Sequence, residues 1–124
     1  MKAHGDVGSI VMIRIALLAL CSIALTGCLS LESARESAAN QVCEYQDRCD
    51  QIGAGKGYAN RSECMTQERA NWMDAWPTSQ CEKTLDVEKL DLCLKAWQAT
   101  ACGNLLDTLS TYGKCSASEV CSKQ

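Results

Sequence analysis

Cysteine is the residue type that most constrains the fold of this chain. The sequence has 124 residues and 10 cysteines, and eight of these cysteines follow residue 42. An even number of cysteines in a small domain is typical of a disulfide framework, which here would contain four bridges. These eight candidate disulfide residues are Cys43, Cys49, Cys64, Cys81, Cys93, Cys102, Cys115 and Cys121. We therefore expect covalent cross-links to supply much of the rigidity of the folded chain.

The apolar core available to this domain is small. From Val42 onward the chain has 16 Val, Ile, Leu, Met or Trp residues and no Phe. So few bulky groups hardly offset the conformational entropy that a small domain loses on folding, whereas each disulfide would add about 2 to 4 kcal/mol of stability. The sequence does not choose among the pairings. We expect Cys49 to pair with Cys64 and Cys81 with Cys93, because each bridge would tie a loop end to the adjacent predicted helix.

The first 27 residues have the organisation of an export signal. Lys2 and Arg14 precede an apolar run, Ile15–Leu25, which is the charged-then-apolar order of a signal peptide. This run has 11 residues, and a helix that spans a bilayer needs about 20. A permanent transmembrane anchor is therefore disfavoured. Met12 is a second candidate start site, and it would give a more usual leader length.

The end of this run and the three residues after it, Leu25-Thr26-Gly27-Cys28, resemble the lipobox of bacterial lipoproteins. In that family the peptide is cleaved before the cysteine, and the thiol is diacylated with chains such as palmitate. The resemblance implies that Cys28 is the lipidation site and that its lipid attaches the protein to a membrane. It also implies export to the oxidising cell envelope, where the other cysteines can pair.

The same resemblance divides the chain into three segments. Residues 1–27 would be the signal peptide, residues 28–33 a lipidated tether, and residues 34–124 a disulfide-stapled helical domain. Leu29 is not the Asp that holds some lipoproteins at the inner membrane. The outer membrane is therefore the favoured location, with the domain facing either the periplasm or the cell surface.

The first helix of the domain should begin at Ser33 and end at Gly53. The run Ser33-Ala34-Arg35-Glu36 has the form of a capping box. Apolar positions then recur every three or four residues and would face inward: Ala38, Val42, Tyr45, Cys49 and Ile52. The opposite face should be solvated and contains Glu44, Asp47, Arg48 and Gln51, with Glu44 and Arg48 spaced as an ion pair.

Two further long helices are expected. The second should follow a cap at Asn60 and run to about Ala75, because Pro77 prevents continuation. A polar connection through Cys81 would precede the third helix, which Asp86 should cap. The inward stripe of that third helix would consist of Val87, Leu90, Leu94, Trp97 and Ala101, with Cys93 alongside.

The end of the chain predicts shorter helices. Asn104 should cap a helix that contains Leu105, Leu106, Leu109 and Tyr112 and stops at Gly113. The run Ser116-Ala117-Ser118-Glu119 repeats the capping box before a last turn. No stretch shows strand-like alternation with β-branched residues. The predicted class is all-α: a small disulfide-rich bundle of three main helices plus one or two short C-terminal helices.

Two sequence features have both a structural and a functional interpretation. Trp72, Trp76 and Trp97 are the largest apolar groups of a chain without Phe, so they would form the core or else a ligand or partner patch. The glycine-rich run 53–57 fails the phosphate-loop pattern, because a helix precedes it and Tyr58 follows. It is predicted to be a connecting loop that could also serve as a contact site.

The spacing of cysteines and turn residues resembles a family of small cysteine-rich bacterial lipoproteins. These carry the label of natural-product-biosynthesis lipoproteins and have no established activity. The resemblance extends over residues 41–121 and offers no catalytic residues. It is carried by Cys43-x5-Cys49, Gly53-x-Gly55-Lys56-x-Tyr58-x2-Arg61-x2-Cys64, Cys93-Leu94, Cys102-Gly103-Asn104, Asp107-Thr108-Leu109 and Cys115-x5-Cys121.

Composition excludes several classes of chemistry. His4 is the only histidine and lies in the predicted signal peptide, so a Ser-His-Asp or Cys-His mechanism would lack its base. No Cys-x2-Cys pair is present for a zinc, iron-sulfur or thiol-redox site. The net charge is −3 without a basic block, which argues against nucleic-acid binding. We predict no catalytic, cofactor-binding or metal-ligating residue and no cofactor.

The expected function is therefore that of a non-catalytic module. We expect a lipid-anchored protein of the cell envelope that presents a disulfide-rigidified helical surface to a protein or small-molecule partner. The family resemblance implies a link to natural-product biosynthesis. The alternatives are a thiol-redox or carboxylate enzyme of the envelope and a secreted inhibitor or immunity-like protein.

Overall fold

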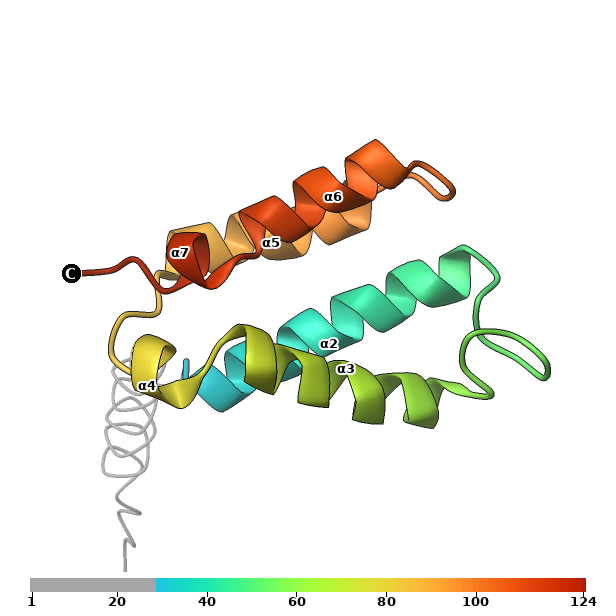
Figure 1. Cartoon of the computed structure of the whole chain (residues 1–124), viewed down its shortest axis with the longest axis horizontal. Helices are drawn as coiled ribbons and strands as arrows, with labels where there is room; N and C mark the ends of the chain where they lie inside the picture. The colour runs from blue at the N-terminus through green and yellow to red at the C-terminus, as the bar shows by residue number, and fades with distance from the viewer. Residues whose placement is uncertain (1–28) are drawn as a thin grey trace, which may run out of the picture.

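The computed structural model describes residues 29–124, and both the predicted signal peptide 1–27 and the predicted lipidation site Cys28 lie outside these residues. The described chain folds into the helices labelled α2 to α7 in Figure 1. Their bounds are α2 Leu31–Arg48, α3 Arg61–Ala75, α4 Thr78–Cys81, α5 Val87–Ala99, α6 Leu105–Lys114 and α7 Ala117–Val120. Within residues 29–124 the β pairing is limited to one isolated bridge, Ile52 with Tyr58. The predicted all-α, disulfide-rich bundle is confirmed.

The helices form two pairs that meet through α2. One pair is α2 with α3, and the other is α5 with α6, beside which α7 lies (Figure 1). α2 also packs against α5. Ala34, Ala38 and Ala39 of α2 are fully buried, and such small side chains allow neighbouring helices to approach closely.

The three tryptophans belong to the core. Trp76, Trp97 and Trp72 are only 0%, 1% and 3% exposed. The Trp72 and Trp76 rings lie 4.5 Å apart between centroids, and Trp97 lies 5.4 Å from the ring of Tyr45. The indole Nε1 of Trp76 donates a hydrogen bond to the carbonyl oxygen of Cys115 at 2.8 Å. The interpretation of these residues as core is therefore correct, although Trp72 also borders a groove described below.

The caps predicted for three helices are present. The side chains of Asn60, Asp86 and Asn104 accept hydrogen bonds from backbone N–H groups in the first turns of α3, α5 and α6. These N–H groups have no acceptor within their own helix, so a cap at each position stabilises the helix start.

Both ends of α2 differ from the prediction. Ser30, not Ser33, is the cap, because its Oγ accepts from the backbone N–H of Ser33 at 3.1 Å. The helix therefore begins inside the segment 28–33 that was expected to be a tether. It ends before Asp50, whose φ of 60° leaves the helical region, and does not continue to Gly53.

The segment around α5 also departs from the predicted pattern. α4 forms within a stretch expected to be a polar connection. In α5, Leu90, Cys93 and Trp97 are buried as predicted, but Val87 is 55% exposed. Ala101 lies beyond the end of the helix and is exposed. The helix thus ends at Ala99, about half a turn before the end that its apolar periodicity indicates.

The predicted ion pair between Glu44 and Arg48 does not form. Arg48 Nη2 instead donates to the carbonyl oxygens of Thr100 and Trp97, at 3.1 and 3.3 Å. The last carbonyl groups of a helix lack donors within that helix. Arg48 of α2 therefore supplies the hydrogen bonds that the carbonyl groups at the end of α5 would otherwise lack. Glu44 lies 3.9 Å from Arg61 of α3.

Four disulfides join different parts of the bundle. The predicted pairs Cys49 with Cys64 and Cys81 with Cys93 are wrong. The antiparallel course of α2 and α3 places Cys43, not Cys49, opposite Cys64, while Cys49 lies at the end of α2 beside the α5–α6 turn (Figure 1). The observed pairs are Cys43–Cys64, Cys49–Cys102, Cys81–Cys121 and Cys93–Cys115.

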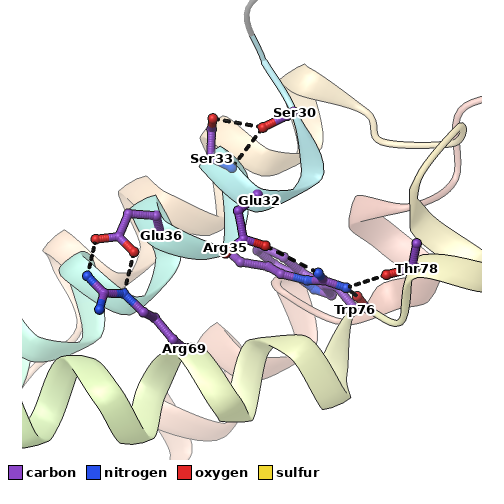
Figure 2. A network of polar contacts seen from close by, with 8 residues as sticks. All are labelled: Ser30, Glu32, Ser33, Arg35, Glu36, Arg69, Trp76 and Thr78. Carbon is purple, nitrogen blue, oxygen red and sulfur yellow. Dashed lines mark hydrogen bonds and ion pairs between the residues drawn. The ribbon is translucent and has the colours of Figure 1, made fainter.

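A buried arginine connects α2 to the turn between α3 and α4. Arg35 is 6% exposed, and its Nη2 donates to the carbonyl oxygen of Trp76 and to Thr78 Oγ1 (Figure 2). Its Nη1 lies 3.6 Å from the exposed carboxylate of Glu32. Figure 2 also shows an exposed ion pair between Arg69 of α3 and Glu36 of α2.

We predict that Arg35→Met lowers the free energy of unfolding by about 1 to 3 kcal/mol, because a buried carbonyl at Trp76 would lose its side-chain donor. Arg69→Met is the matched control on the same helix pair, and it should have a smaller effect because that ion pair is exposed. Urea unfolding of the oxidised proteins, followed by tryptophan fluorescence, measures both. Equal losses for the two variants would contradict the role assigned to Arg35.

Candidate functional site

Two surface grooves lie on opposite sides of α6. The first, here the lysine groove, has a volume of about 610 Å³ and lies between α5 and α6. The second, here the acidic groove, has a volume of about 460 Å³ and lies between α3 and the α6–α7 segment. Ser110, Gly113 and Lys114 face the lysine groove, whereas Tyr112 and Cys115 face the acidic groove. With 3.6 residues per turn these two sets lie on opposite faces of one helix.

α6 is held in place mainly by polar and covalent contacts. Thr111 is its one buried residue, and the Thr111 hydroxyl shares a 2.6 Å hydrogen bond with that of Thr100. Asp107 accepts from the backbone N–H of Ala101 at 2.9 Å, which closes the turn before the helix. The Cys93–Cys115 disulfide fixes the other end to α5. Apart from an edge contact between Tyr112 and Trp97, whose ring centroids lie 5.0 Å apart, the position of α6 therefore depends little on its apolar side chains.

The apolar residues of α6 lie on the surface. We call Leu105, Leu106, Leu109 and Tyr112 the leucine face; their exposed fractions are 71%, 79%, 57% and 48%. The helix continues to Lys114, so the prediction that it stops at Gly113 is wrong. An apolar helix face that meets water is typical of a contact surface.

The lysine groove combines an apolar floor with a charged rim. Small or apolar side chains from both helices line it, among them Leu92, Ala96, Ala99 and Gly113. Its rim contains Lys89, Lys95 and Lys114 but only one acid, Glu119. Lys89 lies 3.3 Å from Glu119, and Lys95 lies 2.6 Å from Asp91. Lys114 has no ion-pair partner within residues 29–124.

The acidic groove contains a buried carboxylate. Glu68 of α3 is 5% exposed, and its Oε1 accepts hydrogen bonds from Tyr58 Oη at 2.9 Å and Asn71 Nδ2 at 3.2 Å. Burial, followed by the hydrogen bond to Glu68, raises the pKa of Tyr58 to about 12. Burial also raises the pKa of Tyr112 across the groove, and the charge of Glu68 is the next cause.

The glycine-rich loop positions Tyr58 over Glu68. Two backbone hydrogen bonds close the loop, from Gly53 N to Tyr58 O at 2.8 Å and from Tyr58 N to Gln51 O at 3.1 Å. Gly55 has a φ of 76°, a conformation that side chains disfavour. Lys56 pairs with Asp50 at the base of the loop. The loop is a connection, as predicted, and it also brings the Tyr58 hydroxyl to Glu68, which lines the acidic groove.

The sequence prediction named no catalytic or cofactor-binding residue in either groove, but Cys115, a predicted disulfide residue, and Trp72, a candidate patch residue, both line the acidic groove. A signal for Glu68 does exist, because Cys64, Glu68 and Trp72 are four residues apart and place an acid within the buried stripe of α3. The eight predicted disulfide cysteines are all paired. Within residues 29–124 no three His, Cys, Asp or Glu side chains converge as metal ligands. None of the described helices is long and apolar enough to cross a membrane.

Stability should fall at high pH because of Tyr58. The pKa of its hydroxyl is about 12 in the fold and near 10.0 without the fold. The native state therefore keeps a proton that the unfolded state loses, so the contribution is complete below pH 10 and is lost as the pH rises through 12. The absorbance difference at the tyrosinate band between wild type and Tyr58→Phe should titrate near pH 12. A difference that titrates near pH 10 would show that Tyr58 is neither buried nor hydrogen-bonded to Glu68 in solution.

Comparison with known proteins identifies the family but no activity. A family model, described as a family of unknown function (DUF6184), matches residues 43–123, which contain all eight paired cysteines. No curated protein matches the chain. No solved structure matches it either. The chain belongs to this family of unknown function, DUF6184.

Proposed function

We propose that this protein is a lipid-anchored, non-catalytic module of the cell envelope that binds a partner protein through the lysine groove and the leucine face. The observation that carries the proposal is the exposure of Leu106 and Leu109 on a helix that disulfide and polar contacts hold in place. Exposed apolar side chains on a rigid support are a common basis of protein recognition.

The chemistry of the lysine groove favours an acidic amphipathic helix as the occupant. α5 and α6 run side by side (Figure 1), and Ala96, Ala99 and Gly113 between them leave room for close approach. Leu106 lies one and two turns before Ser110 and Gly113, on the same side of α6. An apolar stripe on the partner would contact this floor, and its acidic residues would meet the lysines of the rim.

The proposed envelope location rests on the lipobox-like run that ends at Cys28. Only Leu29 and Ser30 separate that cysteine from the first residue of α2. A lipid on Cys28 would therefore hold the N-terminal end of α2 close to the membrane surface. The outer membrane is the favoured location, because position 29 is Leu and not the Asp that holds some lipoproteins at the inner membrane. The further link to natural-product biosynthesis rests on the resemblance to small cysteine-rich lipoproteins with that label.

Burial of the disulfides supports a structural rather than a redox role. Cys43, Cys64, Cys81 and Cys93 are 0% exposed, and Cys115 is 1% exposed. Thiol–disulfide exchange requires a thiolate to reach a sulfur atom, so buried bridges react slowly. Cys102 is the only one of the paired cysteines that is exposed.

The anchoring proposal predicts the intact mass of the protein extracted from membranes. We expect a chain that begins at Cys28, carries added acyl groups, and lacks the eight hydrogens that four disulfides remove. Mass spectrometry without reduction measures all three properties at once. Cys28→Ala should stay unprocessed and should lose the acyl mass. An unmodified, unprocessed wild-type chain would overturn the anchoring proposal.

The binding proposal predicts a site-specific photo-crosslink. A benzophenone amino acid at position 106 should cross-link a partner in intact cells of the native host, and the captured peptide should contain acidic and apolar residues. Position 70 of α3 is the matched control, because Ala70 is also exposed but lies outside both grooves. Lys89→Glu with Lys114→Glu should reduce the yield several-fold, since each exposed charge contact contributes about 0.2 to 1 kcal/mol. Equal yields at positions 106 and 70 would contradict the assigned surface.

A further inference from the structure

We infer that the acidic groove is a binding site for a small organic ammonium ion, a protonated amine carried on an apolar or aromatic body. This site shares no lining residue with the lysine groove and only Tyr112 with the leucine face, so the inference goes beyond the proposed function. Three features of the groove support it: an uncompensated carboxylate, aromatic walls and a rigid frame.

The carboxylate of Glu68 lacks a cationic partner. The ion pairs within residues 29–124 do not include it, so no lysine or arginine of this part of the chain lies within 4.0 Å. Its two hydrogen-bond donors, Tyr58 and Asn71, are neutral groups. A carboxylate that is largely removed from water and has no counter-ion is costly, and a bound cation would offset that cost.

One oxygen of this carboxylate is free for a ligand. Both hydrogen bonds go to Oε1 of Glu68, and Oε2 accepts none from residues 29–124. Some polar atoms of this structure, such as Trp72 Nε1, are fully enclosed and have no hydrogen-bond partner, but Oε2 of Glu68 is not one of them. Oε2 therefore keeps access to solvent, at a groove to which Glu68 contributes. An ammonium group could donate to it directly, as in other charge-assisted hydrogen bonds.

The walls of the acidic groove suit the rest of such a ligand. Trp72 and Tyr112 line it from α3 and α6, together with Ala75 and Ala117. Aromatic faces attract cations, and they also pack well against apolar or aromatic groups. Burial and, next, the charge of Glu68 raise the pKa of Tyr112 on the opposite wall, so this carboxylate and this phenol face the same groove. A volume of about 460 Å³ is in the range of small-molecule sites.

Disulfides fix the groove before any ligand binds. Cys43–Cys64 anchors α3 one turn before Glu68. Cys93–Cys115 anchors the opposite wall, where Cys115 itself lines the groove. Trp76 connects the two sides, because its Nε1 donates to the carbonyl oxygen of Cys115. A site that is ordered in advance loses less conformational entropy on binding.

Titration of the oxidised protein with phenethylammonium tests the inference, since this probe has one protonated amine and one aromatic ring. Amide chemical shifts in ¹H–¹⁵N spectra should move for Asn71, Trp72 and Tyr112. The uncharged isostere 2-phenylethanol should bind at least about tenfold more weakly, because its hydroxyl cannot form the hydrogen bond between two charged groups that the ammonium forms with the carboxylate. The affinity for phenethylammonium should also fall as salt is added.

Two variants isolate the carboxylate. Glu68→Gln keeps the side-chain shape and should weaken phenethylammonium binding by at least about tenfold, since it removes the charge that strengthens the hydrogen bond. Glu82→Gln is the matched control, because Glu82 is exposed and lies outside the acidic groove; it should leave the affinity unchanged. Circular dichroism of both variants verifies their fold.

Three outcomes would overturn the inference. Phenethylammonium and 2-phenylethanol could bind equally well, in which case the groove recognises shape and not charge. The Glu68→Gln protein, folded as wild type, could bind phenethylammonium with unchanged affinity. Chemical shifts could stay constant up to about 10 mM phenethylammonium, a concentration beyond the range of specific small-ligand sites.

Discussion

Covalent connection between helices is the constraint on which the rest of this structure depends. The apolar interior consists of three tryptophans, alanines of α2 and a few aliphatic residues, which is little for a domain of this size. The disulfides compensate, because each closes a loop of 21 to 53 residues and so restricts the unfolded chain. The longest of these loops, Cys49–Cys102, ties the end of α2 to the α5–α6 turn. Trp76 and Arg35 then add directional hydrogen bonds between elements that the bridges already hold close together.

This arrangement explains how α6 can keep apolar residues in water. In most small domains an amphipathic helix is retained because its apolar face is buried. Here Cys115, the Thr100–Thr111 hydroxyl pair and the Asp107 cap of the preceding turn hold the helix instead. Its leucines are consequently free to contact another molecule. The same helix separates two grooves of different character, one with a lysine rim and one with the buried carboxylate of Glu68.

Local chemistry in the sequence predicted much of the fold but little of the candidate sites. The caps at Asn60, Asp86 and Asn104 are short-range signals, and all three mark true helix starts. Disulfide partners depend on which helices lie side by side, and sequence spacing does not contain that information. The burial of Glu68 depends on Tyr58, which reaches it from a loop whose closure is set by backbone hydrogen bonds. Exposure of the leucine face depends on α6 being held by contacts other than apolar packing.

The order of the cysteines along the chain has a consequence for resistance to proteases. Each connection between helices, from the loop after α2 to the turn before α7, lies inside at least one disulfide-closed segment. A single cut in the glycine-rich loop would leave Cys43–Cys64 and Cys49–Cys102 spanning the break. The two fragments would remain one covalent molecule and neither could diffuse away. A nicked copy could thus keep its helices assembled after a peptidase has cut this loop.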